Sequence, residues 1–197
     1  ASTETSTVGT TSASARLTET SFRDEYRVPA MLRRLRATGP VGLVPLAWTF
    51  AATAHLELLD RRAVLIGHLV MTAILVAFAG LSYREMRRDP VLWVWFGVVV
   101  AGIPLTLAGA YSVATGRSLG ARIAILGWMV VPAVALVPTA RARGRSTLAY
   151  GTAAAVTAAG AAVFLLTTLG GGGLTLLALG LAGAGQTLAI AAAVSEG

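Results

Sequence analysis

Long apolar stretches, broken by short charged or glycine-rich links, fill the chain from Val41 onward. Each of six stretches is close to the ~20 residues that an α-helix needs to cross the hydrocarbon core of a bilayer. They cover residues 42–59, 63–82, 91–113, 121–139, 147–169 and 174–194. Four successive glycines, residues 170–173, separate the last two and oppose helix continuation, because glycine loses the most backbone freedom on folding. The pattern predicts an all-α, polytopic integral membrane helix bundle of about six transmembrane helices.

The first forty residues have a different character. Residues 1–28 are rich in Ser and Thr and poor in large apolar groups, which predicts a disordered cytoplasmic tail. In the basic juxtamembrane segment, residues 29–40, Met31, Leu32 and Leu35 fall on one side of a helix and arginines surround them. This segment is expected either to lie on anionic lipids at the cytoplasmic face or to act as a plain positive-inside anchor, and we favour the anchor. Residues 41–197 are the six-helix transmembrane domain.

The arginines predict the orientation of the bundle. All 16 basic residues are arginine, and with a cytoplasmic N-terminus 12 of them fall on inner segments and 4 on outer links. Because cytoplasmic loops carry an excess of basic residues, we expect both termini inside (N-in/C-in) in a multi-pass protein of the plasma membrane. The links are short, so each helix is expected to run antiparallel to the next.

Composition narrows the function classes. The chain is 55% hydrophobic and 13% charged, whereas a soluble domain carries about 25% charged residues. Cysteine is absent, which excludes thiolate metal sites, iron–sulfur clusters and cysteine nucleophiles. The net charge of +7 comes from arginines placed between apolar segments, so it reflects topology and does not indicate a nucleic-acid partner. No nucleophile-elbow or HExxH pattern occurs, and enzymatic activity is not expected without a cofactor.

The stretch "HLELLDRRAVLIGH" holds the two histidines of the chain, His55 and His68. In a tight hairpin whose midpoint lies between Arg61 and Arg62, the two histidines would be level, roughly 10 Å below the turn at 1.5 Å per residue. A polar side chain at that depth needs a partner or a cavity, which makes this histidine pair the main functional hypothesis.

Polar residues of other segments are expected in the same outer half of the bundle. With the histidines they would line an outward-facing polar cavity that binds a small cofactor or handles protons: Glu57, Thr106, Tyr111, Arg122 and Gln186. Imidazole titrates near neutral pH, so such a cavity would suit proton relay or a hydrogen bond to a quinone.

Other functions compete with this one. His55 and His68, with Trp48 seven residues before His55, are suitable residue types for a six-coordinate haem b, but helices packed 8–10 Å apart leave little room for a porphyrin. A small-solute or ion transporter and a purely structural accessory subunit are the further alternatives. A metal site is not expected, because two imidazoles are too few and Glu57 lies about 200° around the helix from His55. The ordinary structural interpretation is that each histidine bonds across the bundle or reaches the headgroups.

Small residues dominate the last two segments. Gly151, Ala155 and Ala159 repeat every four residues, as do Gly180 and Ala184. Such spacing lets transmembrane helices approach closely, either within the chain or between protomers. We therefore expect a homo-oligomer, or assembly with other membrane subunits.

Overall fold

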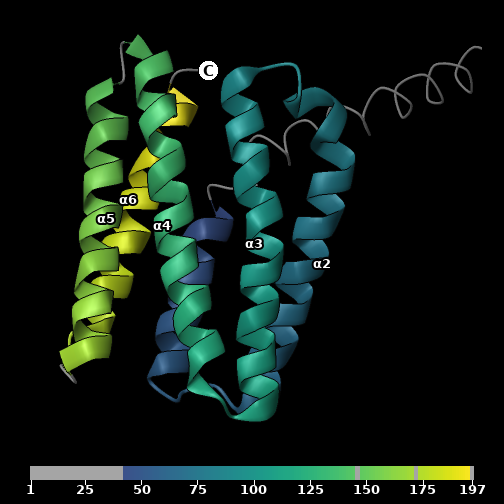
Figure 1. The fold of residues 1–197 in the computed structure, drawn as a ribbon, viewed down its shortest axis with the longest axis vertical. Coiled ribbons are helices and arrows are strands. Elements are labelled where there is room, and N and C mark those ends of the chain that lie inside the picture. Colours follow the sequence, from purple (N-terminus) through teal and green to yellow (C-terminus); the bar gives the residue numbers. More distant parts are fainter. Residues whose placement is uncertain (1–41, 145–146, 171–172, 196–197) are drawn as a thin grey trace, which may run out of the picture. The chain divides into compact units, whose positions relative to one another are not determined.

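The computed structural model describes residues 42–144, 147–170 and 173–195. The predicted tail and juxtamembrane segment, residues 1–40, and part of the glycine link lie outside these residues. The described part is helical and contains no strand. It starts with a first helix over residues 42–55 and continues with α2 (Arg61–Met86), α3 (Pro90–Thr115), α4 (Ser118–Ala142), α5 (Thr147–Gly170) and α6 (Thr175–Ser195), as Figure 1 shows.

The predicted all-α bundle of apolar helices is confirmed. The five helices α2 to α6 are each long and apolar enough to cross a membrane. The described part of the first helix is shorter, and residues 56–60 that follow it form the link to α2.

Local sequence signals set the helix boundaries. Asp60 caps α2, because its carboxylate accepts a hydrogen bond of 2.8 Å from the Ala63 amide. Asp89 caps α3 in the same way, and Pro90 takes the first helical position, where its missing amide hydrogen costs nothing. Gly116 ends α3 in the left-handed region at φ 74°. These polar ends extend α2 and α3 past the apolar segments predicted from hydropathy.

Helices that are neighbours in the chain pack against each other from α2 through α6. The first helix contacts both ends of this series, α2 and α6. Its Phe50 ring lies edge-on to His68 of α2, with ring centroids 6.2 Å apart, and its Trp48 bonds to Gln186 of α6. The first helix therefore joins the beginning of the series to its end.

The core lies mainly among α4, α5 and α6. Of the most apolar window of each helix, 44% is buried in α4 and in α6, against 11% in α2. Buried residues of the core form two clusters, one of Met129, Ala161, Phe164, Ala178, Leu179 and Ala182, and one of Leu136, Ala140, Tyr150, Ala153, Ala189 and Ala192. Most apolar side chains of α2 are consequently not buried within the chain, as expected for a helix next to lipid.

The close approach of α5 and α6 uses glycines that the predicted repeats did not include. A Cβ at Gly160 would lie 2.8 Å from the Ala178 carbonyl oxygen, and one at Gly185 would lie 2.8 Å from the Ala153 carbonyl oxygen. These glycines let the α5 and α6 backbones touch. The predicted small-residue repeats instead lie on exposed surface: Gly151, Ala155, Ala159, Gly180 and Ala184.

Candidate functional site

The link after the first helix decides where the histidines lie. The Leu58 amide donates to the Thr53 carbonyl (3.0 Å) and the Glu57 amide to the Ala54 carbonyl (3.1 Å), while Glu57 takes a left-handed φ of 57°. This pair of bonds is the Schellman arrangement that ends a helix. The first helix therefore stops at its exposed His55.

The two histidines are not level. His68 lies seven residues into α2, about 10 Å along the helix from its first residue, Arg61, whereas His55 is at the turn itself. The expected level pair is wrong because the link spans residues 56–60 and is not centred between Arg61 and Arg62. The two axial ligands that a six-coordinate haem needs are thus not brought together.

His68 is half-buried and held in one orientation. Its Nδ1 lies 2.8 Å from the Val64 carbonyl oxygen. Because a carbonyl only accepts, this bond places the proton of the neutral ring on Nδ1 and leaves a lone pair on Nε2. The Nε2 atom faces α3 at Gly109, where an added Cβ would lie only 2.5 Å away.

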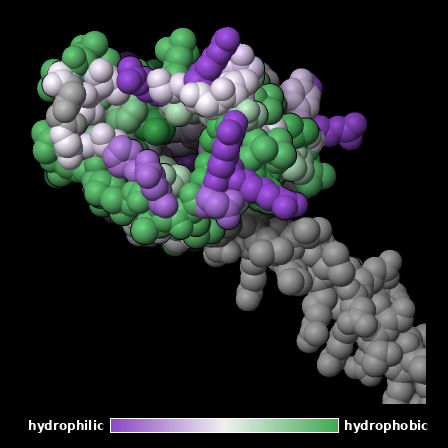
Figure 2. Space-filling view, turned by 90° about the horizontal axis from the view of Figure 1, so that it is seen from below, coloured by the Kyte–Doolittle hydropathy of each residue, from purple (hydrophilic) through white to green (hydrophobic). Residues whose placement is uncertain are grey.

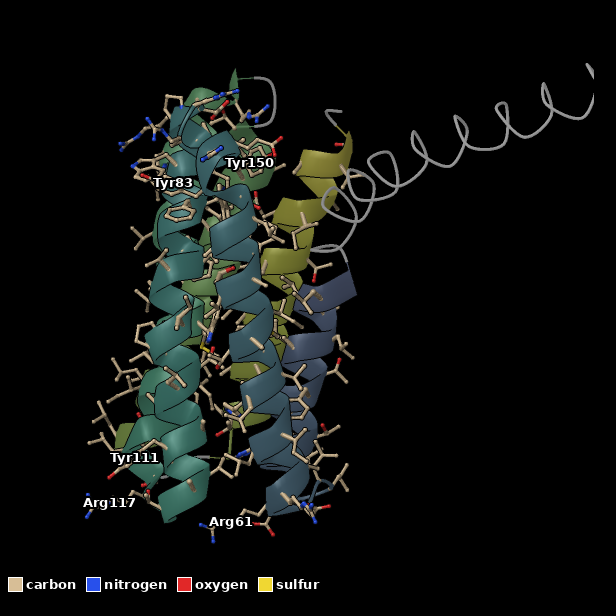
Figure 3. The ribbon with its side chains drawn as sticks, turned by 90° about the vertical axis from the view of Figure 1, so that its right-hand side faces the viewer. Arg61, Tyr83, Tyr111, Arg117 and Tyr150 are labelled. Carbon is tan, nitrogen blue, oxygen red and sulfur yellow. The ribbon has the colours of Figure 1, made fainter. Side chains whose placement is uncertain are left out.

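Three residues predicted to line a cavity lie on the surface. Glu57, Tyr111 and Arg122 are all exposed, Tyr111 by 54%. Figure 3 shows Tyr111 at the end of the bundle that carries Arg61 and Arg117. Figure 2 looks onto this end, where hydrophilic side chains stand around a central hollow. These residues share an end of the bundle with His68, but they do not gather around it.

Arg61 is committed to holding helix ends together. Its Nε and Nη2 donate to the carbonyl oxygens of Val113 and Ala114, each at 2.6 Å. These are among the last carbonyls of α3, which have no partner within the helix and carry the negative end of its dipole. The Ser112 hydroxyl donates to the Arg117 carbonyl at the same helix end.

A hydrogen-bond network in the interior connects four helices. Trp48 Nε1 donates to Gln186 Oε1 (3.0 Å), and Gln186 Nε2 donates to the carbonyl oxygen of Trp128 (2.8 Å). Trp128 Nε1 donates to Thr106 Oγ1 (3.2 Å), which in turn donates to the Gly102 carbonyl (2.8 Å). We call Trp48, Gln186, Trp128 and Thr106 the tryptophan–glutamine network. It joins the first helix, α6, α4 and α3.

The network uses three residues that sequence reasoning assigned to a ligand site. Gln186 and Thr106, expected in a polar cavity, are buried and hydrogen-bonded, and Trp48, expected beside a haem, is the partner of Gln186. Among the described residues, no fully buried side-chain nitrogen or oxygen lacks a partner. Sequence reasoning missed this pairing because the partners are far apart in the chain, although an interior Gln between tryptophan-bearing helices is a usable signal.

A second tryptophan makes a similar tie. Trp95 Nε1 donates to Thr139 Oγ1 (3.1 Å), and that hydroxyl donates to the Ala135 carbonyl (2.8 Å). Two Trp–Thr hydrogen bonds, Trp95–Thr139 and Trp128–Thr106, therefore join α3 and α4 at two positions along their length. Within the described part of the chain, no group of three or more His, Asp or Glu residues is placed to hold a metal ion.

No protein-family model, curated protein or solved structure is significantly similar to this chain.

Proposed function

We propose that this chain is a non-enzymatic, multi-pass protein of the plasma membrane, with both termini cytoplasmic, that acts as a structural subunit in a homo-oligomer or a larger membrane complex. One contrast carries the proposal. The interior polar side chains are hydrogen-bonded within the protein, whereas the small-residue faces of α5 and α6 remain exposed.

The interior supports a structural role. In hydrocarbon, an unpaired polar group is costly, so membrane helices use Gln, Thr and Trp side chains to tie themselves together. In the tryptophan–glutamine network, both indole N–H groups and the Gln186 amide are spent on such ties. The network fixes the positions of four helices relative to one another.

The exposed face of α5 supports assembly. A shallow, open depression lies along it, and most of its lining side chains are small. Small side chains permit a partner helix to come close, which is the main source of helix–helix packing in lipid. The lining residues are Gly144, Thr147, Leu148, Gly151, Thr152 and Ala155.

The cysteine-free chain makes a direct test simple. A single cysteine at Ala155 should form a disulfide-linked dimer in native membranes under mild oxidation, while one at Ala77, exposed on α2, should not. Ala155→Leu should shift the detergent-solubilised protein toward the monomer by filling the depression. A monomer of unchanged mass, with no cross-link at Ala155 or Ala184 and no co-purifying membrane protein, would reject the proposal.

His68 favours a second function, the binding of a small ligand or the handling of protons at the end of the bundle seen in Figure 2. Ligating histidines typically donate one ring N–H to a backbone carbonyl, as His68 does to Val64, which leaves the other nitrogen to bind. Haem b, or a transported small solute or ion, are the ligand classes to test.

Absorption spectra of the purified protein, oxidised and then reduced, would address haem. Proteoliposome uptake would address transport. Either signal should fall in His68→Ala and persist in His55→Ala, because only His68 faces another helix. If the protein is colourless and shows no uptake, only the structural function remains.

A further inference from the structure

Three aromatic side chains form a cluster at the corner where α2 passes into α3. The Trp93 and Phe96 rings stack with centroids 5.0 Å apart and 5° between their planes. Tyr83 meets both edge-on, at 6.1 Å from Trp93 and 5.6 Å from Phe96. We call Tyr83, Trp93 and Phe96 the corner aromatic cluster. It holds α2 and α3 together at this end.

Much of the corner aromatic cluster is not covered by the chain. Tyr83 is 42% exposed and Trp93 is 46% exposed. Tyr83 lies three residues before the end of α2 and Trp93 three residues after the start of α3, about 5 Å from the helix ends. Figure 3 shows Tyr83 near this end of the bundle. In a membrane-spanning bundle this is the headgroup level, where Tyr and Trp rings are favoured.

One arginine contacts the corner aromatic cluster, and two more are its neighbours in the chain. The Arg87 guanidinium carbon lies 5.7 Å from the centroid of the Tyr83 ring, within reach of a cation–π contact, and Arg84 and Arg88 are exposed. Stacking on the ring restricts Arg87 without using up its hydrogen-bond donors. A guanidinium offers paired N–H groups that match two oxygens of a phosphate.

The local charge balance is positive. Two carboxylates lie near this corner in the chain, Glu85 in the last turn of α2 and Asp89 in the link, and Asp89 caps α3, where it accepts bonds from the Val91 and Leu92 amides. The C-terminal end of α4 lies at the same end of the bundle (Figure 1) and adds the exposed Arg141 and Arg143. An anionic group is therefore favoured at this corner over a zwitterionic or cationic one.

We propose that the α2–α3 corner is a binding site for an anionic phospholipid. Arg84, Arg87 and Arg88 bind the phosphate, and the exposed edges of Tyr83 and Trp93 pack against the glycerol and upper acyl chain. The pairing of arginines with outward-facing aromatic rings at headgroup depth selects a lipid, because a soluble phosphate would use the arginines alone. The inference does not depend on the oligomer proposed above.

Quenching of tryptophan fluorescence by brominated lipid tests this directly. The full chain is reconstituted in phosphatidylcholine that contains a small fraction of brominated phosphatidylglycerol, or the same fraction of brominated phosphatidylcholine. The fluorescence of Trp93 is obtained by subtracting the spectrum of Trp93→Phe from that of the wild-type protein. The substitution leaves the tryptophan–glutamine network intact, because the Trp93 indole is not part of it. We expect the brominated anionic lipid to quench Trp93 more strongly, with an enrichment of about five-fold for each arginine that contacts the headgroup.

Charge variants complete the test. Arg84→Gln, Arg87→Gln and Arg88→Gln together should reduce the preference to that of brominated phosphatidylcholine, and Arg87→Lys should retain only part of it. Arg62→Gln, at the opposite end of the bundle, should leave it unchanged. Equal quenching by the two lipids in the wild-type protein, or a preference that survives the triple substitution, would overturn the proposal.

Discussion

The indole nitrogen of Trp48 donates a hydrogen bond of 3.0 Å to the side-chain oxygen of Gln186, which joins the first helix to the last across 138 positions of the chain. The backbones are close at the same place, because a Cβ added at Gly183 would lie 3.1 Å from Trp48 Cβ. A polar tie and a close approach thus coincide where the first helix meets α6.

Removal of either partner of this bond should destabilise the protein moderately. Trp48→Phe keeps the ring size but leaves Gln186 Oε1 without its donor, so we expect a loss of about 0.6 kcal/mol, and at most about 1.7 kcal/mol, the range for interhelical hydrogen bonds in membranes. Unfolding by SDS in mixed micelles measures the change. Gln186→Leu combined with Trp48→Phe should cost less than the sum of the two single changes. Strictly additive costs would show that the bond contributes nothing.

The contact between Gly109 and His68 predicts a steric effect. Gly109→Ala places a Cβ 2.5 Å from His68 Nε2, and the strain should cost about 1–3 kcal/mol. Gly97 is a matched control on the same helix, since a Cβ there meets nothing within 4 Å, and Gly97→Ala should be neutral or stabilising by up to about 1 kcal/mol.

Truncation of the histidine should relieve that strain. In the His68→Ala background, Gly109→Ala is expected to cost much less stability than it costs in the wild-type protein. No recovery would mean that His68 moves aside freely and that Gly109 does not fix its ring.

The left-handed backbone at Glu57 predicts a stabilising substitution. A side chain at φ 57° costs roughly 1–2 kcal/mol relative to glycine, so Glu57→Gly should raise the unfolding free energy by about that amount. Thermal unfolding in detergent reports it. Glu57→Gln separates charge from conformation and should leave stability nearly unchanged, while Glu57→Val should lower it. A lower midpoint for Glu57→Gly would indicate that the carboxylate itself holds the link.

Two glycines of α6 allow a buried and an exposed small residue of the same helix to be compared. Gly185→Ala drives a Cβ into the Ala153 carbonyl of α5 and should destabilise the bundle by about 1–3 kcal/mol. Gly180→Ala, on the exposed face of the same helix, meets nothing within 4 Å and should be tolerated. The same unfolding assay ranks the two, and equal effects would contradict the packing of α5 against α6 described above.

Local information in the sequence determined the helices. Hydrophobic length identified six apolar segments, because span length depends on residues that are adjacent in the chain. The same logic failed at the first link. The sequence has no glycine at the turn, where Glu57 stands. The apolar pattern alone therefore predicted a first helix that is too long, with His55 level with His68.

Only the tertiary structure decided which side chains meet. Gln186 and Thr106 lie in apolar segments, and their role depends on partners in other helices. In the fold they bond to Trp48 and Trp128 and do not line a cavity. The repeats at Gly151 and Gly180 suit packing either within the chain or between protomers, and α5 and α6 meet through Gly160 and Gly185 instead. The physical reason is rotation: in α5 and α6 small residues occur nearly all round, so the pattern leaves the buried face undetermined until the packing of neighbouring helices selects it.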